Sequence, residues 1–394
     1  MNEWKEVLLT DITTRIGDGL HGTPYYDNTG EYYFINGNNL VNGRIIIKDD
    51  TKRVNKSEFQ KHAKPINERT LLVGINGTIG NIAYYNNEKC MLGKSVCYAN
   101  LKDEVEIRYI YYTFLNRDFQ NYIEGIATGT TIPNVPLKGI REYSFKIPPL
   151  AEQKSIASIL SSLDDKIDLL HRQNTTLETM AETLFRQWFV EEAKEEWEEK
   201  KLDDLLLITS SKRIFYSEYV NFGIPFYRSK EIIELHNTGG TNSELFISEQ
   251  RFNEIGSKFG SPKNGDILLT SVGTLGIPYK VKINDKFYFK DGNLTWFKDF
   301  KNISSNIIYC WLKSGIGKEQ LDGITIGSTQ AALTISGLKE IKLKIPPKHL
   351  LAELDSKLEI IYNKIESNQI QIRTLATLRD TLLPKLMSGE IRVN

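Results

Sequence analysis

Two long segments of the chain share an apolar pattern that is typical of paired helices. Within residues 148–190 and again within 346–394, apolar side chains recur at alternating steps of four and three residues. One asparagine interrupts each pattern. This spacing predicts two coiled-coil helices, and the Pro-Pro pair before each pattern marks where a helix can begin. The predicted seam positions are Ile156, Leu160, Leu163, Ile167, Leu170, Asn174 and Leu177 in the first segment, continuing to Met180, Leu184 and Trp188, and Leu354, Leu358, Ile361, Ile365, Asn368, Ile372 and Leu375 in the second, continuing to Leu378, Leu382 and Leu386.

The two asparagines indicate how these helices pair. A buried amide needs a polar group opposite it. Parallel pairing would place Asn174 beside Ile372, whereas the antiparallel register that joins Ile156 to Leu386 places Asn174 beside Asn368. We therefore predict an antiparallel pair whose register is fixed by an Asn174–Asn368 contact. The alternative is that both side chains reach solvent or the helices of another protein.

The rest of the chain mixes short apolar runs with glycine and asparagine. Runs such as YYFI, RIIIK, TLLVGI and NIAYY predict strands, as do IPFYR, DILLTS, IPYKVKI and KFYFK. Residues 107–123 predict one helix, with a counterpart near NIIYCWLKSGI. Each globular part is therefore expected to be α+β, with strands and helices mixed.

The chain contains an internal repeat. Residues 137–149 match residues 335–347 at six of thirteen positions, at an offset of 198 residues. Residues 70–80 match 266–276 at an offset of 196, and the segment at Trp4 resembles the segment at Trp197. Matches in the same order at nearly constant offset indicate a duplication. We expect a globular domain at 1–147, a central helix at 148–190, an acidic joint with a second globular domain at 191–345, and a C-terminal helix and tail at 346–394, related by a pseudo-two-fold axis.

Charge and cysteine content narrow the cellular setting. The chain has 394 residues and no net charge, but residues 191–204 hold eight acidic residues against three lysines, and residues 205–345 hold 18 basic against 13 acidic residues. A neutral total thus leaves room for a basic surface. The three cysteines form no CxxC pair, no signal peptide is visible, and no apolar run is long enough to span a bilayer. We expect a cytoplasmic protein without a membrane partner.

Several motifs carry a resemblance to a known family. They are ATGTTIPNVPLKGI, KIPPLAEQKSIASILSSLDDKI, AETLFRQWFVEE and TLRDTLLPKLMSGEIRV. With them, the chain resembles the specificity subunit of type I restriction-modification enzymes. The resemblance implies that each globular part is a target-recognition domain for one half of a bipartite, asymmetric double-stranded DNA site. It also implies that the helices set the half-site spacing and dock two modification subunits, which methylate adenine with S-adenosylmethionine, and that ATP-using restriction (translocase) subunits join them.

The chain itself is expected to lack catalytic, cofactor and metal sites. It has no NPPY or DPPY motif, no GxGxxG after a strand and no HExxH helix. Asp164 and Asp165 are interpreted as a solvated helix face. Two alternatives are a stand-alone DNA-binding or regulatory protein with the same fold, and a self-contained restriction or methylation enzyme, which the missing motifs disfavour.

Candidate DNA contacts lie in loops that differ between the two copies. Asparagine side chains suit adenine, and arginine or lysine suits guanine or phosphate. The alternative for the asparagine and glycine loops is that they form tight turns. The candidates are Asn36, Asn38, Asn39, Asn76, Thr78, Thr130, Thr131 and Asn134 in the first copy, and Arg228, Lys230, Ser271, Thr274, Ser328, Thr329 and Gln330 in the second.

Overall fold

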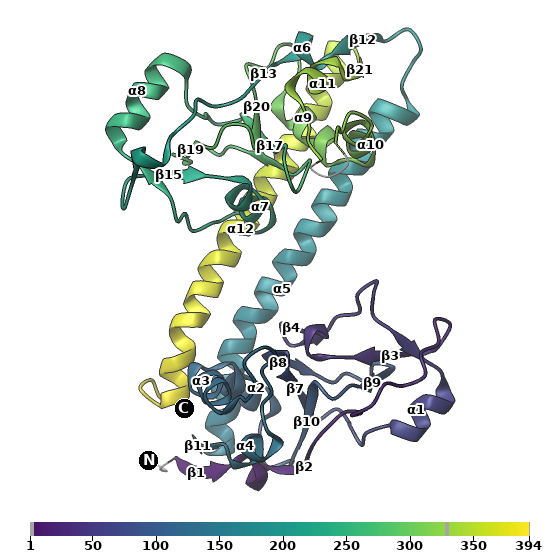
Figure 1. Ribbon diagram of the computed structural model, residues 1–394, viewed down its shortest axis with the longest axis vertical. Helices are drawn as coiled ribbons and strands as arrows, with labels where there is room; N and C mark the ends of the chain where they lie inside the picture. The colour runs from purple at the N-terminus through teal and green to yellow at the C-terminus, as the bar shows by residue number, and fades with distance from the viewer. Residues whose placement is uncertain (1–3, 328–330, 394) are drawn as a thin grey trace. The chain divides into compact units, whose positions relative to one another are not determined.

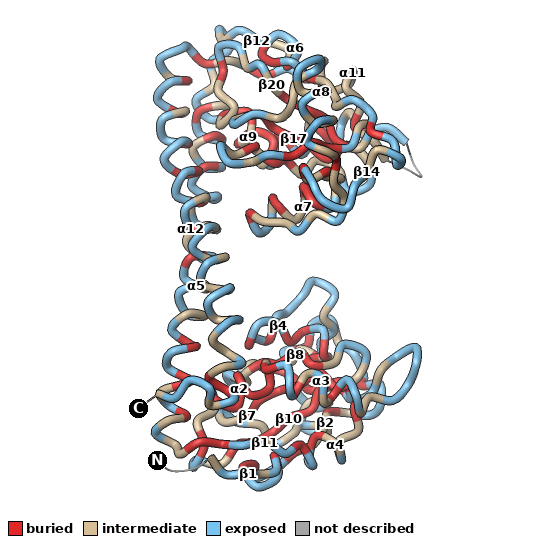
Figure 2. Tube along the Cα trace, turned by 90° about the vertical axis from the view of Figure 1, so that its left-hand side faces the viewer, coloured by how far each residue is buried: buried red, intermediate tan, exposed pale blue. Residues whose placement is uncertain are grey.

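The computed structural model describes residues 4–327 and 331–393, which form two compact units (Figure 1). Unit 1 comprises Met1–Asp165 with Leu375–Asn394, and unit 2 comprises Lys166–Thr374. Two long helices, α5 (Leu150–Arg186) and α12 (Lys348–Ser388), contribute residues to both units. In each unit the buried residues gather on the sheets and on the helices packed against them (Figure 2).

Unit 1 is built on a four-stranded antiparallel sheet in the order β2-β10-β7-β8. Its inner strand β10 is buried along its whole length, so its sequence shows no alternation of apolar and polar residues, and the buried Asn100 donates to the Pro65 carbonyl oxygen. The strands are β1 (Lys5–Leu8), β2 (Thr13–Asp18), β3 (Tyr32–Ile35), β4 (Leu40–Val41), β5 (Arg44–Ile45), β6 (Arg53–Val54), β7 (Thr70–Asn76), β8 (Thr78–Tyr84), β9 (Cys90–Leu92), β10 (Val96–Leu101) and β11 (Ser144–Ile147). The shorter helices are α1 (Lys56–His62), α2 (Ile107–Leu115), α3 (Arg117–Ile126) and α4 (Leu137–Glu142).

Unit 2 repeats this plan, with its main sheet in the order β13-β20-β17-β18. The duplication is therefore structural as well as sequential. The strands are β12 (Glu198–Lys201), β13 (Leu207–Thr209), β14 (Tyr219–Val220), β15 (Ile224–Tyr227), β16 (Phe246–Ile247), β17 (Ile267–Thr270), β18 (Pro278–Lys280), β19 (Tyr288–Phe289), β20 (Leu294–Lys298) and β21 (Lys342–Ile345). The shorter helices are α6 (Leu202–Leu205), α7 (Ser229–Thr238), α8 (Glu249–Phe259), α9 (Ser305–Lys313), α10 (Gly315–Gly323) and α11 (Ile335–Glu340).

The single helix predicted over residues 107–123 is wrong, because the chain forms two helices there. Asn116 has extended backbone angles, and its side chain accepts a hydrogen bond from the N–H of Arg117, so it caps α3. Ser314 caps α10 in the same way at the matching place in unit 2, by accepting from the N–H of Gly317. The apolar spacing continues across both caps, which is why periodicity alone missed the breaks.

The two long helices run antiparallel in each unit. In unit 1, Ile156 and Leu160 of α5 share a core with Leu386 and Met387 of α12. In unit 2, Asn368 Nδ2 donates to Asn174 Oδ1 at 2.8 Å, which confirms the predicted asparagine contact. Asn368 is fully buried, so the contact supplies the partner that its Nδ2 needs, whereas its Oδ1 has no hydrogen-bond partner among the described residues.

The four-three pattern extends less far than predicted. Met180 and Leu378 are 49% and 45% exposed, so neither occupies a buried seam position. In the same part of α5, Ala181 and Phe185 are buried in the core of unit 2. The Cys310 thiol of α9 donates to the Ala181 carbonyl oxygen, which shows that α5 turns this face to the globular part of unit 2. Packing against a third element therefore overrides the two-helix periodicity there.

Asp164 anchors the globular part of unit 1 to the long helices. Tyr112 Oη of α2 donates to Asp164 Oδ2 at 2.6 Å, and Arg379 Nη1 of α12 donates to Asp164 Oδ1 at 2.8 Å. The interpretation of Asp164 as a solvated residue is thus wrong, whereas Asp165 is exposed. Burial and the hydrogen bond to Asp164 raise the pKa of Tyr112, so the phenol remains a donor. We call Tyr112, Asp164 and Arg379 the Asp164 cluster.

His236 gives unit 2 an expected sensitivity to acid. Its Nδ1 lies 2.7 Å from the Pro278 carbonyl oxygen, and burial lowers its pKa below the ordinary value of 6.5. As the pH falls through about 6.5, the unfolded chain therefore takes up a proton that the folded chain resists, and folding stability declines. Denaturant unfolding at a series of pH values should show this loss, and it should be smaller in His236→Gln. An equal loss in both proteins would assign the acid sensitivity to other groups.

Candidate nucleic-acid interface

Strand order brings the candidate loops of unit 1 to one edge of its main sheet. β2 and β7 end at the same edge at which β8 and β10 begin, since neighbouring strands are antiparallel. The loop edge of unit 1, as we call it, comprises residues 19–22, 76–78 and 93–95. Two further segments join it: the N–H of Gly37 donates to Ser95 Oγ, and Asn76 forms a bridge with Asn134.

The three asparagines at residues 36–39 have different roles in the structure. Asn39 is 4% exposed, and its Nδ2 donates to the Ile46 carbonyl oxygen and to Thr51 Oγ1, so its amide stabilises the loop. Asn36 Oδ1 accepts a hydrogen bond from Ser95 Oγ at 2.9 Å. Asn38 is exposed. Asn39 therefore has the structural role of a turn residue. A contact with a base from this loop stays a prediction, and Asn38 is its strongest candidate because its side chain is exposed.

The candidates at residues 76–78 and 129–134 form one joined surface. Asn76 Nδ2 donates to Asn134 Oδ1 at 3.0 Å, while Thr78, Thr130 and Thr131 are exposed. Gly77 has φ +71°, a conformation that favours glycine, and its N–H donates to the Pro133 carbonyl oxygen. Because that N–H is already donated to Pro133, the exposed threonine hydroxyls are the better candidates for polar contacts with DNA.

Unit 2 places its loops at the equivalent edge. The loop edge of unit 2 comprises residues 210–213, 271–276 and 290–293, and the N–H of Ser271 donates to the Asn293 carbonyl oxygen across it. Thr274 is exposed, but Ser271 is 3% exposed and its Oγ lies 2.7 Å from Thr295 Oγ1, so Ser271 has a packing role. The candidates Ser328, Thr329 and Gln330 lie outside the described residues.

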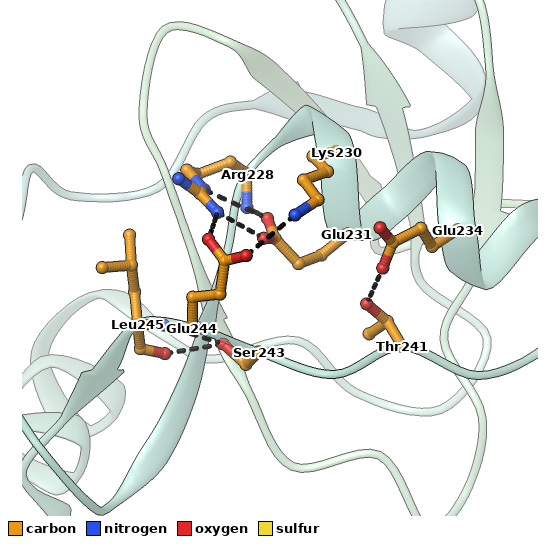
Figure 3. A network of polar contacts seen from close by, with 8 residues as sticks. All are labelled: Arg228, Lys230, Glu231, Glu234, Thr241, Ser243, Glu244 and Leu245. Carbon is orange, nitrogen blue, oxygen red and sulfur yellow. Dashed lines mark hydrogen bonds and ion pairs between the residues drawn. The ribbon is translucent and has the colours of Figure 1, made fainter. Parts of the chain in front are cut away.

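Arg228 is held by two glutamates (Figure 3). Its Nη2 donates to Glu231 Oε1 at 2.6 Å and to Glu244 Oε2 at 3.2 Å, and its Nε donates to Glu231 Oε2 at 3.3 Å. Lys230 Nζ donates to Glu244 Oε1 at 2.9 Å. The hydrogen bond to Glu231 raises the pKa of Arg228 further, so the guanidinium is charged at any physiological pH. Arg228 follows β15 directly, as Asn36 follows β3 in unit 1.

Sequence reasoning missed a set of exposed aromatic side chains. Tyr25 in unit 1 is 81% exposed, and Tyr216 in unit 2 is 87% exposed. Both lie between the first strand of the main sheet and the strand that leads to Asn36 or Arg228. Exposed aromatic side chains can contact the sugars of a duplex or enter between its base pairs, so these residues join the candidates for DNA contact. The sequence signal for these residues is that aromatic side chains stand next to turn-forming residues in PYYDN and RIFYSEY. Strand propensity alone does not distinguish such exposed aromatic residues from those of a buried strand.

The described residues give no indication of another kind of centre. Residues 4–327 and 331–393 contain no group of three or more histidine, cysteine or acidic side chains placed to hold a metal ion. Within the same ranges, no helix is both long and apolar enough to cross a bilayer. Cys90, Cys97 and Cys310 are free thiols in the core.

Comparison with known proteins identifies the family. The family model for the type I restriction modification DNA specificity domain matches residues 1–179 and again residues 194–375. The chain therefore belongs to the specificity subunits of type I restriction-modification systems.

Individual relatives agree with this assignment. The MjaIX specificity subunit of Methanocaldococcus jannaschii is 28% identical over 383 residues, covering 86% of this chain and 83% of that one. The HindI specificity subunit of Haemophilus influenzae is 23% identical, covering 99% and 100%. The crystal structure of the S subunit from M. genitalium has the same fold, with a TM-score of 0.63, 20% identity, and coverage of 98% and 96%.

Proposed function

We propose that each unit recognises one half of a bipartite, asymmetric site on double-stranded DNA. The observation that carries this proposal is the repeated sheet order, which presents two equivalent loop edges with different side chains. Asn36 and Asn38 in unit 1 correspond to Arg228 and Lys230 in unit 2. Amides and cations prefer different bases, so one chain recognises two different half-sites. The chain itself carries no catalytic step and uses no cofactor of its own.

We further propose a division of labour along the chain. Residues 1–147 and 191–345 contain the two target-recognition domains, while 148–190 and 346–394 contain the spacer helices, which set the distance between half-sites. The helices also dock two modification subunits, which supply S-adenosylmethionine and methylate adenine, and ATP-using restriction subunits join that core. Exposed apolar side chains on α5 and α12 support a docking role, because such groups favour a protein partner. They include Ile159, Leu169, Ile360 and Ile370.

Methylation of host DNA tests this proposal directly. The chain is co-expressed with a modification subunit encoded beside it, and N6-methyladenine is mapped by single-molecule sequencing. We expect methylation in both halves of one bipartite motif, and only when this chain is present. A stable complex without dependent methylation would contradict the proposal and favour a stand-alone DNA-binding protein.

Arg228→Ala is expected to relax sequence preference in only one half-site. An arginine fork held in a fixed orientation recognises guanine through two hydrogen bonds, and its loss costs roughly 1–3 kcal/mol of discrimination. The methylated motif of the variant should therefore become degenerate at one position or a few adjacent ones. Asn38→Ala should act on the other half-site. Uniform weakening at all sequences, with a shallower salt dependence, would instead assign Arg228 to a phosphate.

A further inference from the structure

Glu244 occupies an unusual position for an acidic residue on a proposed DNA-binding surface. It lies between α7 and β16, and its side chain is 62% exposed. Each of its carboxylate oxygens accepts from a different cation, Oε1 from Lys230 and Oε2 from Arg228 (Figure 3). Glu244 is the middle residue of a Ser243–Leu245 turn that is held by its own hydrogen bond, since Ser243 Oγ donates to the Leu245 carbonyl oxygen at 2.7 Å.

The two glutamates that hold Arg228 are not equivalent. Glu231 is 1% exposed, contacts both Nε and Nη2 of Arg228, and accepts from the Arg228 backbone N–H at 2.7 Å. Although burial alone would raise the pKa of Glu231, the hydrogen bonds from Arg228 lower it. Glu231 is therefore a fixed part of the fold that orients the guanidinium. Glu244 makes one longer contact with Arg228 from the solvent side, so it can leave without disturbing that orientation.

An exposed carboxylate at this place acts against DNA phosphate in two ways. Together with Glu231 it balances the positive charges of Arg228 and Lys230, and its own negative charge repels the phosphate backbone. Displacing the Glu244 carboxylate costs its hydrogen bonds with Arg228 and Lys230, so the group that takes its place must accept those hydrogen bonds instead. The acceptor pair on guanine, O6 and N7, matches an oriented guanidinium geometrically. A phosphate also accepts two hydrogen bonds from a guanidinium, but it carries a full negative charge, which the Glu244 carboxylate repels more strongly than the neutral edge of guanine. A counter-ion of this kind lowers affinity for unrelated sequences more than for the matching one.

We propose that Glu244 is a specificity-determining residue, a displaceable counter-ion that keeps Arg228 and Lys230 from binding DNA phosphates indiscriminately. This inference rests on the proposed function and deepens it, because it names the residue that makes unit 2 selective. It acts through Arg228 and Lys230 rather than by contacting a base. Its effect is confined to the half-site that unit 2 recognises.

Glu244→Gln tests the inference, with Glu249→Gln as the matched control. Glu249, the first residue of α8, is also exposed and forms an ion pair with Lys286 at 2.7 Å. Its substitution by glutamine therefore changes the net charge by the same amount. The full-length chain, in complex with modification subunits, is titrated with a pool of random-sequence duplexes and with a duplex selected from that pool. Anisotropy at several salt concentrations gives the affinities, and thermal unfolding checks that each variant is folded.

We expect Glu244→Gln to bind the random pool roughly two- to fivefold more tightly than Glu249→Gln. Its salt dependence should be steeper by about one phosphate contact. Affinity for the selected duplex should change less, and motif degeneracy should increase only in the unit 2 half-site. In an Arg228→Ala background the effect of Glu244→Gln should shrink, because the two residues act together.

Three results would overturn the inference. Equal behaviour of the Glu244 and Glu249 variants would show that only net charge matters. Weaker binding to the selected duplex with unchanged pool binding would show that Glu244 contacts a base itself. Failure of the unaltered complex to bind any duplex would instead overturn the proposed function, and this inference with it.

Discussion

Insertion of one heptad into each long helix is expected to lengthen the gap between the two half-sites of the recognised DNA motif by about three base pairs. Seven helical residues lengthen a helix by about 10.5 Å, and one base pair lengthens a DNA duplex by about 3.4 Å. Insertions after Leu170 in α5 and after Gln371 in α12 preserve every pair of the observed antiparallel register, including Asn174 with Asn368. A heptad restores the same coiled-coil face, so both half-sites should keep their sequences. The prediction therefore separates spacing from base recognition.

Mapping N6-methyladenine in cells that carry the double insertion measures this directly. We expect the original motif to lose methylation and a motif with the same halves and a longer gap to gain it. Insertion into α5 alone is the control, since it moves Asn174 away from Asn368 and leaves a fully buried amide unpaired. That protein should be destabilised and should methylate neither motif. Unchanged spacing in the double insertion would refute the spacer role.

Asp164→Ala is expected to lower the free energy of unfolding of unit 1 by roughly 2–3 kcal/mol. The substitution removes the acceptor of Tyr112 and one ion partner of Arg379 together, while Arg379 keeps its contact with the exposed Asp380 at 2.8 Å. Arg379 is 29% exposed at its side chain, so water screens part of the loss, and the expected effect lies below that of a fully buried pair. The globular part should loosen from α12 before the sheet unfolds.

Asp165→Ala is the matched control for this experiment. Asp165 is the next residue on α5, and its 3.5 Å contact with Arg108 is exposed on both sides, so its loss should change stability by less than about 1 kcal/mol. Denaturant unfolding compares the two variants, and hydrogen exchange in α2 locates the change. Equal stability of both variants would show that the Asp164 cluster contributes little to holding α2.

The domain organisation of this chain was predictable from its sequence because the sequence contains an internal repeat. The offset matches identified β7 and β17 as equivalent strands of the two units, and the interrupted apolar pattern located the Asn174–Asn368 contact. Both the repeat and the helix seam are recognised from buried positions, where the core requires apolar side chains or a matched polar pair. The fold class and the antiparallel helices followed from them.

Local polar chemistry was not predictable in the same way. The break at Asn116 depends on a side chain that competes with the helix for one N–H, and the apolar period runs on across it. Glu244 lies 16 residues from Arg228 in a segment without periodicity, so nothing in the sequence pairs them. Asn39 has the residue type that suits a base contact, yet its amide holds its own loop. In each case the partner is fixed by the fold, which sequence patterns specify only coarsely.

The Asp164 cluster has a consequence for half-length versions of this chain. The repeat offset of 198 residues equates Arg379 with Ala181 and Asn368 with Leu170. Two copies of residues 1–190, paired through α5 alone, would therefore set Asp164 near Ala181 and Asn174 near Leu170, leaving a carboxylate and an amide without their partners. The two halves have diverged so that the polar side chains of α5 have their partners on α12, and we expect intramolecular pairing to be favoured over self-association of either half.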